Sequence, residues 1–186
     1  MSHSCETFAN RAIEALATLE TEGEAEVDGR IVAGIHTTWD ETEGSVALAY
    51  RSEPETLLRL EAKVSGQPRW LTFNIDLGAG AFAAGDVIGL VADIASDEDC
   101  SLEMFVRSAT ETGDVDTELS EALSVSSGRS VATALHVVAA DDGMARADKF
   151  HMLGIRLPKQ HFRLDIRGLR VLVRPAAEAS AAPAAG

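Results

Sequence analysis

The sequence has few aromatic residues, few cysteines and no long run of apolar residues. Aromatic side chains make up 5% of its 186 residues, and the only cysteines are Cys5 and Cys100. No apolar stretch approaches the roughly 20 residues of a membrane-spanning helix. The first 20 residues lack the basic start and apolar block of a secretory signal. We therefore expect a cytoplasmic protein with two reduced thiols and no membrane partner.

The sequence also lacks the short motifs that identify common catalytic and cofactor sites. It contains no GxSxG, HExxH, GxxxxGK[ST] or CxxC sequence. The histidines show no spacing of two or four residues, so they predict no zinc site; His151 falls on the apolar side of its segment and is expected to be an interior, hydrogen-bonded residue. We therefore expect no enzyme. A hydrolase with two convergent carboxylates stays as a third hypothesis, because 30 acidic residues make chance pairs common.

Negative charge dominates the sequence and is unevenly distributed. The net charge is −14, and residues 1–145 hold 27 of the 30 acidic side chains but only eight of the 16 basic ones. Residues 146–174 hold the other eight basic side chains against two acidic ones. An acidic surface repels phosphate groups, so nucleic acid is not an expected partner. For the basic segment, ion pairs within a sheet are favoured over an anion site.

Hydrophobic periodicity predicts one helix followed by strands. Over residues 4–22 the spacing of three and four predicts a helix, with Ser4 as its N-cap and an apolar face of Cys5, Phe8, Ala12, Leu16 and Leu19. Alternating segments predict nine strands, at about 30–38, 45–51, 56–64, 69–77, 86–95, 101–109, 130–139, 150–157 and 161–174. This spacing is typical of a mostly β protein, an antiparallel β-sandwich or barrel. The tail, residues 175–186, is expected to be disordered.

The alternation also predicts the core, because residues on the apolar side of each strand share a face. A change of phase at Gly168 predicts a β-bulge in the last strand. The predicted core residues are Leu58, Leu60, Ala62, Val64, Ile88, Leu90, Ala92, Ile94, Leu102, Met104, Val106, Leu135, Val137, Leu153, Ile155, Leu157, Phe162, Leu164, Ile166, Leu169, Val171 and Val173.

The stretch RWLTFNIDLG, residues 69–78, carries a tryptophan and polar side chains opposite its apolar residues. Trp70, Asn74 and Asp76 share that side, and Arg107 projects outward from the strand at 101–109. If these strands and the last strand are neighbours, they form one face. A tryptophan ring there can stack on a sugar while amide, carboxylate and guanidinium groups bind its hydroxyls. We therefore predict a sugar site of Trp70, Asn74, Asp76 and Arg107, with a solvated sheet face as the alternative.

Two acidic loops are candidates for calcium, which takes six to eight oxygen ligands. The segment SDEDC contributes Asp97 and Asp99, and GDVDTE contributes Asp114 and Asp116 at alternate positions. Neither segment matches a defined calcium loop, and acidic loops are usually solvated. No cofactor is expected, apart from calcium at these four residues as a hypothesis.

Three stretches resemble the jelly-roll sandwiches of carbohydrate-binding modules. They are RWLTFNIDLG, DVIGLVADIASDEDCSLEMFVRS and FHMLGIRLPKQHFRLDIRGLRVLV, and the resemblance covers about residues 30–174. It implies a jelly-roll sandwich with the helix at 4–22 packed on it, and a non-catalytic role in binding a polysaccharide or glycoconjugate. The missing signal and the few aromatics beyond phenylalanine (Trp39, Trp70 and Tyr50) depart from secreted modules. A protein-interaction or assembly module without a sugar ligand, including a homo-oligomer, is the alternative.

Overall fold

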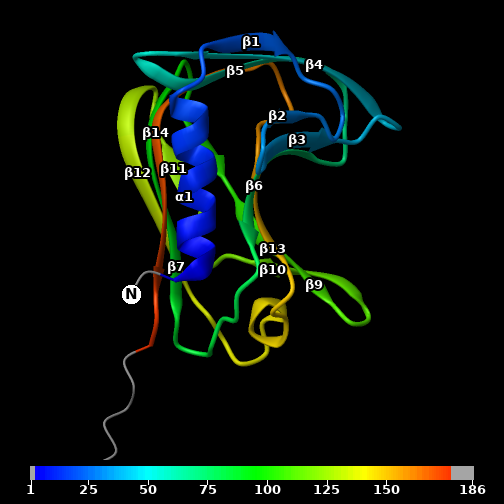
Figure 1. Cartoon of the computed structure of the whole chain (residues 1–186). Helices are drawn as coiled ribbons and strands as arrows, with labels where there is room; N and C mark the ends of the chain where they lie inside the picture. The colour runs from blue at the N-terminus through cyan, green and yellow to red at the C-terminus, as the bar shows by residue number, and fades with distance from the viewer. Residues whose placement is uncertain (1–2, 177–186) are drawn as a thin grey trace, which may run out of the picture.

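Two six-stranded antiparallel sheets face each other in the computed structural model, which describes residues 3–176 (Figure 1). The first sheet has the strand order β1-β4-β5-β14-β7-β12, and the second has the order β10-β9-β13-β6-β3-β2. A small third sheet pairs β11 with β8. The strands are β1 (Thr21–Glu24), β2 (Arg30–Val32), β3 (Ile35–Trp39), β4 (Gly44–Glu53), β5 (Thr56–Gly66), β6 (Leu71–Gly78), β7 (Val87–Ser96), β8 (Cys100–Leu102), β9 (Met104–Thr110), β10 (Gly113–Glu118), β11 (Leu123–Val125), β12 (Gly128–Val137), β13 (His151–Arg156) and β14 (Phe162–Arg174).

The core lies between the two sheets, where the apolar sides of the alternating strands meet. Phe73, Leu60, Ile88 and Leu153 are completely buried there. Almost all predicted core residues are buried or pack against the buried cluster. The predicted bulge is also confirmed, because the register of β14 against β7 shifts between Ile166 and Gly168.

The predicted core was wrong on β12. Leu135 and Val137 are 41% and 61% exposed, while Ala132 and Ala134 are buried in their place. Both sides of this strand carry apolar residues, so alternation alone cannot fix its phase. His136, on the inward side with the alanines, hydrogen-bonds through its ring nitrogens to the backbone N–H of Ser120 and to Asp142.

The N-terminal helix α1 runs from Ser4 to Ala17 and is shorter than the predicted 4–22. His3, rather than Ser4, is its N-cap and accepts a hydrogen bond from the backbone N–H of Cys5. The buried face is centred on Ala9 and Ile13, so Phe8 is about half exposed. Leu19 lies beyond the end of the helix and is also about half exposed. Within residues 3–176 no helix is long and apolar enough to span a bilayer.

Helix α1 lies across the open mouth between the two sheets (Figure 1). β14 pairs with β5 only over Phe162–Ile166, which leaves the edge of its later residues without a strand. Asn10 occupies this edge: its amide donates to the carbonyl of Val171 at 2.8 Å and accepts from the N–H of Val171 at 3.1 Å. Glu6 accepts from the N–H of Val173 at 3.1 Å. The helix therefore serves as a substitute strand.

Three strands and a short helix are absent from the predicted elements. Thr21–Glu24 pairs with β4, Gly113–Glu118 forms a hairpin with β9, and Leu123–Val125 pairs with β8. β1 and β10 are polar and largely exposed, so they lack the alternation that marks a half-buried strand. A 3₁₀ helix, η1, spans Gly143–Arg146.

Candidate functional site

The outer face of the second sheet, turned away from the core, presents polar side chains in rows that cross the strands. One row reads Asp76 on β6, Met152 on β13, Arg107 on β9 and Asp116 on β10. Neighbouring strands lie about 4.8 Å apart, so Asp76 and Arg107 stand roughly 10 Å apart with Met152 between them. Arg107 is held in place by a bidentate pair with Asp116, with both contacts at 2.7 Å.

A second row on this face runs through Asn74. It reads His36 on β3, Asn74 on β6, Gly154 on β13, Phe105 on β9 and Glu118 on β10. Gly154 has no side chain, and the ring of Phe105 lies in the space above it. A Cβ atom on Gly154 would stand only 2.3 Å from the Cζ of that ring. The glycine is therefore required by the ring that covers it.

Two arginines cover the Phe105 ring in turn. The guanidinium carbon of Arg156 lies 4.9 Å from the ring centroid, and that of Arg107 lies 5.6 Å from it. Arg156 forms a bidentate pair with Glu118, with both contacts at 2.6 Å. The hydrogen bonds to these carboxylates raise the pKa of each arginine above its usual value. The result is a layered stack of backbone, ring, guanidinium and carboxylate.

A cavity of about 360 Å³ opens beside this stack. Three carboxylates, two guanidinium groups and one imidazole surround it, with Met152 and Phe150 as apolar surfaces. In this cavity the His36 Nδ1 lies 3.9 Å from the Asp76 Oδ1. The lining residues are Asp28, Arg30, His36, Asp76, Arg107, Ala109, Asp114, Phe150 and Met152. Such a mixture of polar and apolar groups suits an amphipathic ligand such as a sugar.

Asn74 lies next to this cavity but is completely buried. Neither its Oδ1 nor its Nδ2 has a hydrogen-bond partner in the described part of the chain. Two of its neighbours line the cavity. They are His36, which pairs with it on β3, and Asp76, which lies two residues further along β6. An amide in this state is unusual, because buried polar groups in folded proteins are almost always hydrogen-bonded.

Trp70 lies on the same strand side but far from the cavity. It precedes β6 by one residue, and six residues of extended chain separate it from Asp76, which is roughly 20 Å. The ring is 41% exposed, and the guanidinium of Arg69 lies 5.0 Å from its centroid. One side of the ring is therefore covered by Arg69, and a stacking ligand could use only the other side.

Asp40 fixes the backbone beside Trp70. This buried carboxylate accepts hydrogen bonds from Thr42 and from the backbone and side chain of Arg69. These bonds, with that of the Thr42 hydroxyl first, hold the pKa of Asp40 well below its usual range. Its own backbone N–H donates to the carbonyl of Trp70 at 3.0 Å. The turn that carries Trp70 is therefore ordered by a charge rather than by apolar packing.

The structure thus places three predicted residues together and the fourth apart. Asp76 and Arg107 line the cavity, Asn74 lies beside it, and Trp70 stands at the far end of β6. The condition that the last strand is a neighbour of these strands is not met, because β14 belongs to the first sheet. Its outward side chains Arg163 and Asp165 therefore lie across the sandwich from the cavity.

Several residues of the cavity carried no sequence signal. Asp28 lies in a polar segment before the first predicted strand, Arg30 stands at the start of that strand, and Met152 stands in an apolar segment. Asp28 has a φ of 57°, which is uncommon for a residue other than glycine and shows that the loop is held in an unfavourable conformation. Gly154, a lone glycine in a strand, was the one available hint of close approach by another group.

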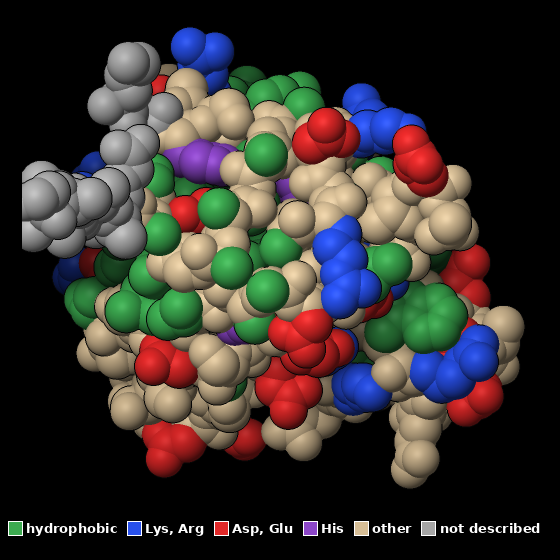
Figure 2. Space-filling view, turned by 90° about the horizontal axis from the view of Figure 1, so that it is seen from below, with side chains coloured by type: hydrophobic (Ala, Val, Ile, Leu, Met, Phe, Trp, Pro, Cys, Tyr) green, Lys and Arg blue, Asp and Glu red, His purple; other side chains and the backbone are tan. Residues whose placement is uncertain are grey.

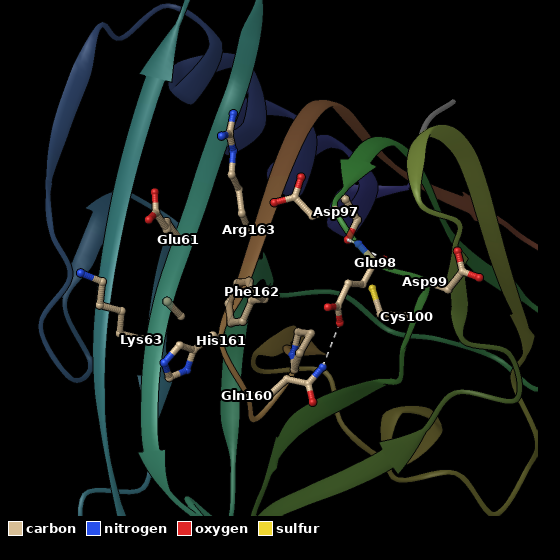
Figure 3. Close-up of a pocket in the computed structure, with 13 residues that line it drawn as sticks. Glu61, Lys63, Asp97, Glu98, Asp99, Cys100, Gln160, His161, Phe162 and Arg163 are labelled. Atoms are coloured by element: carbon tan, nitrogen blue, oxygen red, sulfur yellow. Dashed lines mark hydrogen bonds between the residues drawn. The ribbon is translucent and has the colours of Figure 1, made fainter.

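The four acidic residues considered for calcium do not form one cluster. Asp114 and Asp116 lie on β10 in the second sheet, whereas Asp97 and Asp99 lie in the turn between β7 and β8. Figure 3 shows Asp97 and Asp99 pointing in opposite directions, with Glu98 directed toward Gln160. Among residues 3–176 no three His, Cys, Asp or Glu side chains are arranged to hold a metal ion. Calcium at these positions stays a prediction.

His151 is an interior, hydrogen-bonded residue, as expected. Its Nε2 donates to the carbonyl of Gly80 and its Nδ1 accepts from the hydroxyl of Ser108, both at 2.8 Å. Burial lowers the pKa of the imidazole, so the neutral form is favoured. Both Ser108 and His151 are completely buried, so this serine–histidine pair has no access to a substrate.

Comparisons with known proteins place the fold. No family model and no curated protein matches the chain. Among solved structures, a family 4 carbohydrate-binding module (CBM4) aligns with a TM-score of 0.51 at 11% identity, over 75% of this chain and 86% of that one. The chain has a jelly-roll fold.

Two further structures align with this jelly roll. The Stig cyclase Fisc from Fischerella sp. TAU, in complex with (3Z)-3-(1-methyl-2-pyrrolidinylidene)-3H-indole, has a TM-score of 0.51 at 11% identity, over 90% and 96% of the two chains. A family 11 carbohydrate-binding module from Clostridium thermocellum, in complex with a β-1,3-1,4-mixed-linked tetrasaccharide, has a TM-score of 0.49 at 12% identity, over 87% and 99%. At such identities the likeness concerns the fold alone, and the two structures with a TM-score of 0.51 are a carbohydrate-binding module and a cyclase.

Proposed function

We propose that this protein is a non-catalytic carbohydrate-binding domain whose ligand enters the cavity on the outer face of the second sheet. The single observation that supports it is the lining of that cavity. Asp76 and His36 offer hydrogen bonds on one side and Arg107 on the other, with the apolar Met152 between them. This arrangement matches a sugar ring, which presents hydroxyls at its rim and C–H groups on its faces.

The charges around the cavity favour an uncharged sugar. Asp28, Asp76 and Asp114 line it, and Asp116 neutralises Arg107 from outside. Carboxylates outnumber the cations, so an acidic sugar would meet like charge. We therefore propose a neutral oligosaccharide as the ligand class, with Trp70 as a second contact when the oligosaccharide is long enough to follow β6.

The test is a screen of the purified protein against an array of neutral and acidic glycans, with and without calcium. Asp76→Ala should weaken the binding of any positive glycan at least tenfold, because a hydrogen bond to a charged group is lost. The matched control is Asp93→Ala, which removes an outward carboxylate of the first sheet. An array without positives, or equal loss in both variants, would refute the proposal. A calcium requirement would support a metal in the acidic loops.

A second candidate function is self-assembly through the outer face of the first sheet. Val131, Leu135 and Val137 project from β12 and are 70%, 41% and 61% exposed. Viewed from the lower end of the sandwich, hydrophobic side chains gather on the side where β7 and β12 lie, while acidic and basic side chains are interspersed elsewhere (Figure 2). Large exposed apolar patches commonly mark interaction sites.

The charges beside this apolar stripe favour a second copy of the chain as its partner. Arg170 and Arg174 are exposed on β14, which β7 separates from β12, and neither has an ion-pair partner within residues 3–176. A protein of net charge −14 offers acidic surface to these arginines. The partner would pack against the face rather than extend the sheet at Leu135, because Glu121 and Ser120 already satisfy the backbone N–H and C=O of that residue.

Sedimentation equilibrium over a range of protein and salt concentrations tests this second candidate. A dimer should weaken as ionic strength rises and should be lost in Val131→Asp. The matched control is Val115→Asp, which places the same charge at an exposed valine of the second sheet. A protein that stays monomeric at high concentration and low salt would exclude self-assembly through this face.

A further inference from the structure

We propose that the ring of Phe105 is a displaceable cover on the outer face of the second sheet. Asn74, which is buried in the same row of this face, is the group that recognises the sugar once the ring moves. The inference rests on the proposed function and names the chemistry of the ligand. A primary amide offers one acceptor oxygen and an NH₂ donor side by side. Two neighbouring hydroxyls on a sugar ring, one donating and one accepting, match that pair.

The amide of Asn74 is in a state that costs the protein stability. Asn74 is completely buried, and neither Oδ1 nor Nδ2 has a hydrogen-bond partner among the described residues. An unsatisfied buried polar group costs stability, whereas an apolar side chain of similar shape would cost nothing. The site therefore sacrifices stability at this position, as functional sites often do.

The ring of Phe105 lies in the same row of the sheet as Asn74. Asn74, Gly154 and Phe105 follow one another across three adjacent strands. The Cζ tip of the Phe105 ring reaches over Gly154, where it stands between its own strand and Asn74. Gly154 has no side chain, so the space above this glycine is filled by the ring of Phe105 alone. A shift of the ring would open the row from the cavity toward the amide.

The contacts that hold the Phe105 ring in place are weak. Arg107 and Arg156 cover it by cation–π contacts, and their side chains are 47% and 33% exposed. Contacts of this kind at exposed positions are weak, and ligand hydroxyls can compete for the guanidiniums. Arg107 also lines the cavity. A sugar that binds Arg107 therefore acts on the cover directly.

Asn74→Leu is the decisive variant because the proposal predicts effects of opposite sign. The unfolding midpoint in urea should rise or stay equal, since an unsatisfied amide is replaced by an apolar group of similar size. Binding should weaken roughly tenfold or more, because two hydrogen bonds to the sugar are lost. Thr72→Val is the matched control: this buried residue lies on the same strand side and should leave binding unchanged.

The probes are cellotetraose, xylotetraose and the mixed-linked β-1,3-1,4 tetrasaccharide, measured by isothermal titration calorimetry. If none binds the wild-type protein and the glycan array has no positive, the proposed function fails and this inference fails with it. If a probe binds wild type and Asn74→Leu equally, only this inference is overturned. A lower unfolding midpoint of Asn74→Leu would also overturn it, because the amide would then have a structural role.

Movement of the ring can be followed separately. Protein labelled with 4-fluorophenylalanine gives one ¹⁹F resonance for each of its six phenylalanines, and Phe105→Leu identifies the one that belongs to Phe105. Saturation with the bound probe should shift or broaden this resonance more than those of the four phenylalanines that lie outside the cavity, whereas Phe150 lines the cavity and should respond as well. A Phe105 resonance that does not change when the sugar binds would overturn the role of the ring as a cover.

Discussion

Replacing Asn10 by alanine should destabilise the protein by about 2–3 kcal/mol. The Asn10 amide satisfies both the N–H and the C=O of Val171, at 3.1 and 2.8 Å, along an edge of β14 that β5 does not reach. Each net hydrogen bond contributes about 0.5–1.5 kcal/mol, and the partly buried backbone groups left behind add a desolvation cost. Such a loss is a large fraction of the roughly 5–15 kcal/mol by which domains are stable.

Urea unfolding measures this loss as a lower midpoint at an unchanged slope, and thermal unfolding should show a decrease of roughly 4–12 °C. The matched control is Glu14→Ala, which alters an exposed position on the same helix and should change stability by less than about 0.5 kcal/mol. Hydrogen exchange at the Val171 amide should also accelerate in Asn10→Ala. A loss below about 0.5 kcal/mol would show that the helix packs on the mouth without serving as a strand.

Three further predictions concern single positions. Gly154→Ala should cost about 1–3 kcal/mol because its Cβ would meet the Phe105 ring, and combining it with Phe105→Ala should remove that penalty, as measured by a double-mutant cycle in urea. Asp40→Asn should lower the free energy of unfolding at pH 7. Because the pKa of Asp40 is depressed in the folded state, the difference in this free energy from wild type should shrink as pH falls below about 4. A difference that stays constant between pH 7 and pH 2 would contradict this. Burial raises the pKa of Cys5 to about 11, so a thiol reagent at pH 8 should leave Cys5 unmodified until urea unfolds the protein, with Cys5→Ala to identify the site.

The sequence predicted the architecture well because most strands have one apolar side. The strands that carry Leu58, Ile88 and Leu153 each keep apolar residues at alternate positions along one side, and each was found within a few residues of its true bounds. Prediction failed where that signal was absent. β10 is polar on both sides, and its structure depends on the hairpin that it forms with β9. β12 is apolar on both sides, and its pairing with β7 determines which side is buried.

The candidate site could be predicted only in part, for a related reason. Alternation correctly put Asn74, Asp76 and Arg107 on outward positions of the strands that carry them. It could not tell which strands share a sheet, so it left open whether β14 lies beside β6, and β14 lies in the opposite sheet. Nor could it show that Trp70 stands about 20 Å from Asp76, or that Phe105 lies over Gly154.

The way α1 closes the sandwich also has a consequence for the order in which the chain folds. The bonds between Asn10 and Val171 join residues 161 positions apart, so the helix is made well before its docking edge on β14. During synthesis, the side of α1 that docks on β14 must wait until that strand has left the ribosome. Such distant contacts slow folding and leave apolar surface exposed in intermediates. We therefore expect chains truncated before residue 171 to aggregate, and the completion of β14 to coincide with the last cooperative step of folding.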